Sequence, residues 1–246
     1  MYPVLFEIFG RQIGTYGLFM ILGAVSAWIL VRLLAGKGNK DLSLVFLICV
    51  CGGLIGAFLL RPIMRIPEIF IYWEHFSQMS PRVFLLVYFG EIVFYGGLIG
   101  GAIAMVLFCR GFNIPILPMA DLFAPALALA HGFGRIGCFM GGCCFGITRF
   151  PLQLIEAACL FILAAILAVI YKKTAVKGLT VCMYGFIYSI LRFILEFYRG
   201  DTARGIYAGL STSQYISIVL FIVSAVLLYV VVRKQGIASQ ADNDNE

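Results

Sequence analysis

The sequence is poor in charged residues and almost devoid of histidine. Charged residues make up 12% of its 246 residues, against about a quarter in soluble domains, and it contains two histidines. With 62% hydrophobic residues, this composition excludes a soluble globular domain. The motifs G-x-S-x-G, H-E-x-x-H, the P-loop and the aspartate-rich metal motifs are also absent, which argues against an intramembrane hydrolase, a nucleotidase or a metal-dependent phosphotransferase. No basic stripe indicates a nucleic-acid partner.

Long apolar runs dominate what remains. A membrane-spanning helix needs about 20 mostly apolar residues, and seven stretches approach or reach this length. The predicted spans are 14–34, 42–60, 92–109, 119–138, 152–171, 179–198 and 212–232. The sequence therefore predicts an all-α polytopic membrane protein, a single membrane domain over residues 1–246.

The positions of the lysines indicate an orientation. All lysines fall after the first or fifth predicted span or in the tail: Lys37, Lys40, Lys172, Lys173, Lys177 and Lys234. By the positive-inside rule these segments are cytoplasmic, so the N-terminus is expected outside and the C-terminus inside. An odd number of spans requires the same arrangement.

Two segments are expected to form structures at the outer face. Residues 61–90 contain Pro62, Pro67 and Pro81 among aromatic residues, which predicts an outer arm lying on the bilayer rather than one continuous helix. Residues 137–150 are rich in glycine and cysteine and are predicted to form an outer loop.

Arginine, unlike lysine, gathers on the predicted outer side. The residues concerned are Arg11, Arg61, Arg65, Arg82, Arg135, Arg149, Arg199 and Arg204. Any single one is as well explained by a side chain that anchors a helix end as by a binding site. For the set as a whole, we favour a site for an anionic lipid, because a guanidinium can hold phosphate with two hydrogen bonds.

The glycine-rich segment 132–146 carries one charge, Arg135. Glycine weakens a helix by roughly 0.5–1 kcal/mol relative to alanine, so six in fifteen residues suggest an open backbone that admits an anionic head group. Gly96 and Gly97 begin two G-x-x-x-G spacings in span three, which predict close helix packing and leave room for lipid.

Span six carries Arg192, Glu196 and Arg199 on one helical stripe. A buried arginine in a membrane needs a partner, and Glu196 is the expected one. A purely structural ion pair and a functional site explain this pair equally well, but two arginines against one carboxylate favour an anion site. Glu156 lies about one turn into span five and is expected to pair with an arginine or to be functional.

Most of the eight cysteines lie in apolar spans, but Cys138, Cys143 and Cys144 cluster on the outer side. A metal site is not expected, since zinc usually takes four regularly spaced ligands. A disulfide from Cys138 to Cys143 or Cys144 stays open.

Five ordered segments resemble the bacterial prolipoprotein diacylglyceryl transferase family. They are F-Y-G-G-L-I-G-G (94–101), D-L-F-A-P (121–125), G-R-I-G-C-F-M-G-G-C-C-F-G (134–146), P-L-Q-L-I-E (151–156) and L-R-F-I-L-E-F-Y-R (191–199). The resemblance implies a transferase, without a cofactor, in the bacterial cytoplasmic (inner) membrane, its active site open to the outer face and the bilayer. It implies transfer of diacylglyceryl from phosphatidylglycerol to the lipobox cysteine of a preprolipoprotein, with formation of a thioether and release of glycerol phosphate.

The resemblance also implies roles for individual residues. Arg135, Arg192, Tyr95 and Glu196 are the expected catalytic residues. The expected phosphatidylglycerol-binding residues are Arg135, Arg192, Arg199, Tyr16, Gly96, Gly97, Gln153, Glu156, Gly137 and Gly142.

The chain departs from the family pattern at three places. Tyr95 stands where the best-known members have a histidine, a candidate base, and His131 is an alternative base that is better explained as a packed polar residue. Cys138, Gly141 and Cys143 replace two asparagines and an acidic residue, and Phe58 replaces an arginine. These changes keep a second hypothesis open: a non-catalytic protein of the same fold that binds or transports anionic phospholipid.

Overall fold

The computed structural model describes residues 4–8, 11–36, 42–66, 70, 79–89, 93–200 and 206–243. Within these residues seven helices are long and apolar enough to cross a membrane. They are α1 Thr15–Ala35, α2 Leu42–Met64, α6 Phe94–Gly111, α7 Ile116–Gly141, α8 Leu152–Lys173, α9 Leu179–Glu196 and the first part of α10 Thr212–Asn243. The seven predicted spans are confirmed to within a few residues, as expected for a polytopic membrane protein.

Two short hairpins accompany the helices, which the all-α prediction omitted. Strands β1 (Val4–Ile8) and β2 (Arg11–Gly14) pair antiparallel, as do β3 (Ile206–Tyr207) and β4 (Leu210–Ser211). Ala208 and Gly209 join β3 to β4 with φ of 48° and 83°. Two successive positive φ values are typical of the tight two-residue turns of hairpins.

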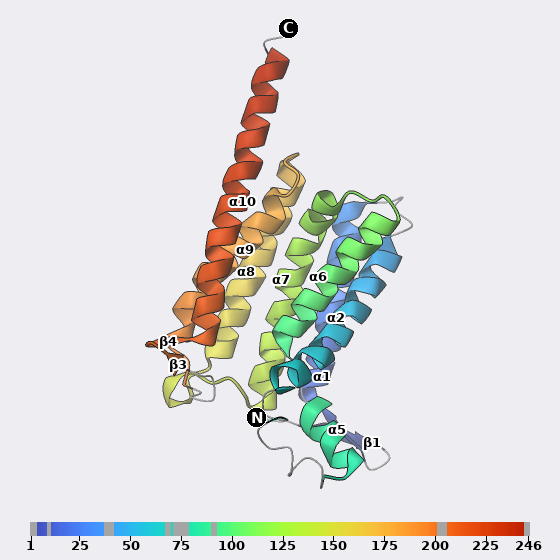
Figure 1. Cartoon of the computed structure of the whole chain (residues 1–246), viewed down its shortest axis with the longest axis vertical. Coiled ribbons are helices and arrows are strands. Elements are labelled where there is room, and N and C mark those ends of the chain that lie inside the picture. Colours follow the sequence, from blue (N-terminus) through green and yellow to red (C-terminus); the bar gives the residue numbers. More distant parts are fainter. Residues whose placement is uncertain are drawn as a thin grey trace. The chain divides into compact units, whose positions relative to one another are not determined.

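The chain forms two compact units, which are described separately: Met1–Lys37 with Leu117–Glu246, and Gly38–Ile116. In the larger unit α8, α9 and α10 run side by side (Figure 1). A buried apolar cluster joins α7, α8 and α9 through Ala128, Leu160, Leu167, Tyr184 and Tyr188, among others. This packing brings the polar residues of three helices together at the end where β3 and β4 lie.

In the smaller unit α2 packs closely against α6 through glycines. A β-carbon on Gly56 would overlap the Gly96 carbonyl, and one on Gly100 would overlap the Gly52 carbonyl. The backbones can approach this closely only without side chains, so the packing predicted from the G-x-x-x-G spacings is confirmed.

The arm predicted at 61–90 is described only in part. Helix α2 continues through Pro62 to Met64, and a short helix, α5 (Pro81–Phe89), begins at a proline. Proline suits a first helical position because the N–H that it lacks would have no partner there. Residues 67–69, 71–78 and 90 lie outside the described residues, so the placement of an arm on the bilayer stays a prediction.

The loop predicted at 137–150 begins later than expected, and this boundary was wrong. Helix α7 continues through Gly137 to Gly141, and only then does the chain turn, through Gly142, into a short 3-10 helix, η1 (Ile147–Arg149). Contact with α1 explains the extension: a β-carbon on Gly137 would lie 3.2 Å from side-chain carbons of Tyr16 and Phe19. Tertiary packing thus outweighs the low helix propensity of glycine.

Candidate active site

A line of alternating charges joins α7, α8 and the end of α9. Arg135 on α7 contacts Glu156 on α8 at 3.0 Å, and Glu156 lies 3.7 Å from Arg192 on α9. Arg192 contacts Glu196 at 2.7 Å, and Glu196 lies 3.9 Å from Arg199. We call Arg135, Glu156, Arg192, Glu196 and Arg199 the ion-pair cluster. The predicted Arg192–Glu196 pair and the predicted pairing of Glu156 with an arginine are confirmed.

The ion-pair cluster is buried and carries a surplus of positive charge. The side chain of Arg135 is 12% exposed, and the side chains of the other four residues of the cluster are 3–5% exposed. Desolvating ions costs several kcal/mol each, and alternating signs offset part of this cost. Three guanidiniums face two carboxylates, so one positive charge is left without a carboxylate inside the cluster. An anionic ligand would balance it.

The start of α10 holds the carboxylate of Glu196 in place. The Ser211 hydroxyl donates to Glu196 Oε1 at 2.9 Å, and Arg192 donates to the Ser213 hydroxyl at 3.2 Å. Ser211 also forms a capping box with Gln214: its hydroxyl accepts from the Gln214 N–H, and the Gln214 side chain accepts from the Ser211 N–H. The sequence reasoning missed these residues, although S-T-S-Q before an apolar run is a readable capping signal.

Two further polar atoms at this site lack a hydrogen-bond partner among the described residues. They are Arg135 Nε and Gln153 Oε1, and both are buried. Buried polar atoms are normally hydrogen-bonded, so these two are available to a polar ligand. Gln153 donates through its Nε2 to the Cys143 carbonyl at 2.6 Å, which fixes its side chain between α8 and the loop.

The loop after α7 brings three thiols together. Its backbone folds back through positive φ values at Gly142 (79°) and Cys144 (65°), and the Cys143 N–H donates to the Cys138 carbonyl at 3.1 Å. The sulfur atoms of Cys138, Cys143 and Cys144 all lie within 4.8 Å of one another, as free thiols. Hydrogen bonds from the other two thiols, together with the Arg199 guanidinium, lower the pKa of the Cys144 thiol.

The same loop pairs with the segment after α9. The Ile147 N–H donates to the Tyr198 carbonyl at 2.9 Å, and the Gly200 N–H donates to the Phe145 carbonyl at 3.0 Å. A β-carbon on Gly146 would lie 3.1 Å from the Tyr198 carbonyl oxygen. The sequence alone does not identify Gly146 as important, because the close contact that disfavours a side chain there is made with Tyr198, a residue distant in the sequence.

Tyr16 on α1 borders both the thiols and Arg135. Its ring packs on Gly137, and its hydroxyl interacts electrostatically with Arg135 and with all three cysteines of the loop. The structure therefore places Tyr16, Gly137, Gly142 and Gln153 around the ion-pair cluster and the adjoining loop, and their role in lipid binding stays a prediction.

Tyr95, Gly96 and Gly97 belong to the smaller unit and are described within it. Tyr95 lies in the first turn of α6, where its ring meets that of Phe94 edge-on at 5.9 Å. Gly96 packs against Gly56, and a β-carbon on Gly97 would lie 3.5 Å from the Gly53 carbonyl oxygen. Their roles in substrate binding or catalysis stay predictions.

His131 lies one turn before Arg135 and is buried. Its ring meets the Tyr188 ring edge-on at 5.1 Å. This contact agrees with the interpretation of His131 as a packed polar residue.

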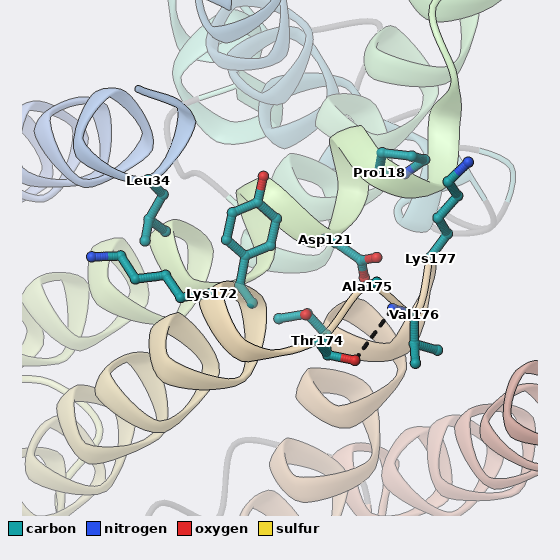
Figure 2. A pocket seen from close by; sticks show the side chains of 10 residues that line it. Leu34, Pro118, Asp121, Lys172, Thr174, Ala175, Val176 and Lys177 are labelled. Carbon is teal, nitrogen blue, oxygen red and sulfur yellow. Dashed lines mark hydrogen bonds between the residues drawn. The ribbon is translucent and has the colours of Figure 1, made fainter. Parts of the chain in front are cut away.

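A separate cavity of about 380 Å³ lies near the beginning of α7 and the connection from α8 to α9 (Figure 2). Asp121, Lys172, Thr174 and Lys177 line it together with apolar side chains. Asp121 accepts hydrogen bonds from the N–H groups of Gly178 and Val181, so it caps α9 rather than its own helix. At 1.5 Å per residue, Asp121 and Arg135 are about 21 Å apart along α7, so the cavity and the ion-pair cluster are distinct.

Comparison with known proteins shows the family of the chain. The sequence model of the family described as prolipoprotein diacylglyceryl transferase matches residues 3–230. The chain is similar to the phosphatidylglycerol–prolipoprotein diacylglyceryl transferase of Clostridium tetani, with 35% identity over 91% of this chain and 95% of the relative. The chain is 34% identical to phosphatidylglycerol–prolipoprotein diacylglyceryl transferase 2 of Clostridium perfringens, over 95% of this chain and 96% of the relative. It is 31% identical to the phosphatidylglycerol–prolipoprotein diacylglyceryl transferase of Helicobacter pylori, over 92% of each chain.

Proposed function

The chain belongs to the prolipoprotein diacylglyceryl transferase family, and from this premise we propose that it transfers diacylglyceryl from phosphatidylglycerol to the lipobox cysteine of a preprolipoprotein. The reaction forms a thioether and releases glycerol phosphate. The observation that carries the proposal is the buried ion-pair cluster with its surplus positive charge. A phosphodiester carries one negative charge and matches that surplus.

Arg135 and Arg192 are the proposed phosphate-binding residues. Arg135 uses one terminal nitrogen for Glu156, while its Nε is buried without a hydrogen-bond partner among the described residues. Glu156 and Glu196 hold the guanidiniums in fixed orientations, as does the Ser213 hydroxyl for Arg192. Donors oriented before the reaction stabilise charge more effectively than donors that must reorganise.

In the proposed step, the cysteine sulfur bonds to the glycerol carbon that carries the phosphate. The carbon–oxygen bond to phosphate breaks, its electron pair stays on the departing glycerol phosphate, and the proton of the thiol is lost. Negative charge therefore grows on the phosphate in the transition state, next to Arg135 and Arg192. Arg199 and the predicted binding residues of the larger unit, Tyr16, Gly137, Gly142, Gln153 and Glu156, shape the lipid site, and the roles assigned to Gly96 and Gly97 of the smaller unit stay predictions.

Activation of the thiol needs little free energy. A thiol with a pKa of about 8.5 requires about 2 kcal/mol to ionise at pH 7, and nearby positive charge supplies part of it. The thiolate is itself a strong nucleophile. Tyr95 is proposed to orient the substrate or to relay the proton.

The seven spans and the distribution of lysine support a placement in the bacterial inner membrane with the C-terminus in the cytoplasm. The α8–α9 connection, with Lys172, Lys173 and Lys177, then lies on the cytoplasmic side. The site is proposed to face the outer side and the bilayer, where phosphatidylglycerol and an exported lipobox segment can both reach it.

Transfer in detergent micelles tests the proposal. Purified protein is mixed with phosphatidylglycerol and a lipobox peptide, and mass spectrometry measures the gain of diacylglyceryl on the peptide cysteine. We expect the parent chain to transfer diacylglyceryl and Arg135→Ala to lose at least 100-fold of this rate, because preorganised donors of this kind contribute about 10²–10³ in rate. The matched control is Arg110→Ala, which changes an exposed arginine in the last turn of α6 and should leave the transfer rate nearly unchanged. Full transfer by Arg135→Ala would contradict the assignment of the phosphate site. Lipid binding without any transfer by the parent chain would favour the non-catalytic hypothesis.

A further inference from the structure

The three thiols of the loop after α7 form a compact set of soft ligands. Their sulfur atoms lie within 4.8 Å of one another, and they come from both sides of the turn: Cys138 from the last turn of α7, Cys143 and Cys144 from the segment beyond it. The sequence pattern alone argues against a metal, because four regularly spaced ligands are lacking. The fold supplies a proximity that the spacing C-x4-C-C does not reveal.

The spacing of the sulfur atoms suits a tetrahedral cation. Zinc–sulfur bonds of about 2.3 Å separate neighbouring ligands in a tetrahedral site by about 3.8 Å, inside the observed limit. A disulfide would use two of the thiols and leave the third unexplained. Soft thiolate ligands select Zn²⁺ and similar cations over the hard ions Mg²⁺ and Ca²⁺.

The surroundings hold the ligands in place. The Cys143 carbonyl is fixed by Gln153, and its N–H is fixed by the Cys138 carbonyl. The guanidinium of Arg199 contacts the Cys144 sulfur, and Arg135 interacts electrostatically with Cys138. Only thiolates bind the cation, so binding itself displaces the protons of the thiols.

We propose that Cys138, Cys143 and Cys144 form a three-thiolate site for a thiophilic divalent cation of the Zn²⁺ class. Three protein ligands leave one tetrahedral position for an external ligand, as in catalytic rather than structural zinc sites. The next inference rests on the proposed function: the thiol of the acceptor cysteine of the preprolipoprotein takes this position, and its proton passes to water as its sulfur binds the cation.

Metal content tests the site without reference to transfer activity. The purified full chain is stripped of metal, loaded with Zn²⁺ and passed through a desalting column, and zinc per protein is measured by mass spectrometry. We expect one zinc per chain in the parent and in the control Cys51→Ser, whose thiol is exposed on α2, and at least a tenfold lower content in Cys143→Ser and in the triple Cys→Ser variant.

Bound zinc should also protect Cys138, Cys143 and Cys144 from alkylation, relative to the same chain after the metal is removed. This measurement separates a specific site from a misfolded variant, because it is made on the parent chain alone. Equal zinc in all variants, no retained zinc, or a disulfide found among the three cysteines under reducing purification would each overturn the site.

Cobalt reports on the open position. Co²⁺ replaces Zn²⁺ in the parent chain, and the sulfur-to-cobalt charge-transfer band is recorded with a lipobox peptide and with the same peptide carrying serine in place of cysteine. We expect the band to grow with the cysteine peptide only. An unchanged band would overturn the binding of the acceptor thiol at the metal. Because none of these three experiments measures transfer, a failure of any one of them is distinct from a failure of the proposed function.

Discussion

The α2–α6 interface and the α7–α9 site hold membrane helices together in opposite ways. Between α2 and α6 the contact is made largely by glycines, and backbone lies against backbone. Glu156 on α8 pairs across the helices with Arg135 on α7 and Arg192 on α9, and Glu196 pairs along the chain with Arg192 and Arg199, in nearly complete burial. The first interface needs only shape. The second interface buries charged side chains, and their desolvation costs free energy that helix packing alone does not require. Charged residues buried within a membrane protein therefore indicate a function.

The largest effect is expected where this charge balance is broken. Arg192→Ala leaves Glu156 and Glu196 buried with one partner fewer, which should lower the free energy of unfolding by about 3–5 kcal/mol and abolish transfer. Denaturation in micelles and the transfer assay measure the two effects. The double variant Arg192→Ala/Glu196→Ala should recover part of the stability but no activity. Recovery of activity would show that Arg192 serves only to neutralise Glu196.

A smaller effect is expected from a substitution at the glycine interface between α2 and α6, where the free energy of unfolding should decrease. Gly56→Leu places a side chain against the backbone of α6, and overpacking of this kind costs about 1–3 kcal/mol. Gly111→Ala is the matched control, since a β-carbon there meets nothing within 4 Å. Thermal unfolding followed by circular dichroism compares the two. Equal melting temperatures would contradict the close contact of α2 with α6.

The smallest effect is expected at the support of the ion-pair cluster. Ser211→Ala removes the cap of α10 and the hydrogen bond to Glu196, at a cost of about 1–2 kcal/mol in the free energy of unfolding. Transfer should fall several-fold because Glu196 loses one of its holding contacts. Ser224→Ala, a change on the buried side of α10 outside the cluster, is the control for transfer. Equal transfer by both variants would assign Ser211 to capping alone.

Individual residues show which contacts could be predicted from the sequence and which could not. The Arg192–Glu196 pair could be predicted because two residues four positions apart on a helix place their side chains on the same face. The partners of Arg135 and the hydrogen bond from Ser211 could not, because they join helices whose relative rotation no local pattern specifies. The length of α7 was misjudged for the same reason: its glycines disfavour a helix locally, yet they fit against α1.

The sequence by itself determined that this is a membrane-spanning helical protein, and its ordered motifs indicated the family, because hydrophobic length and residue order are local properties of a chain. Only the tertiary structure decided that Arg135, Glu156 and Arg192 share one buried line, and that three cysteines of a turn face one another. These are contacts between residues distant along the chain or across a turn, and their positions depend on how whole helices pack.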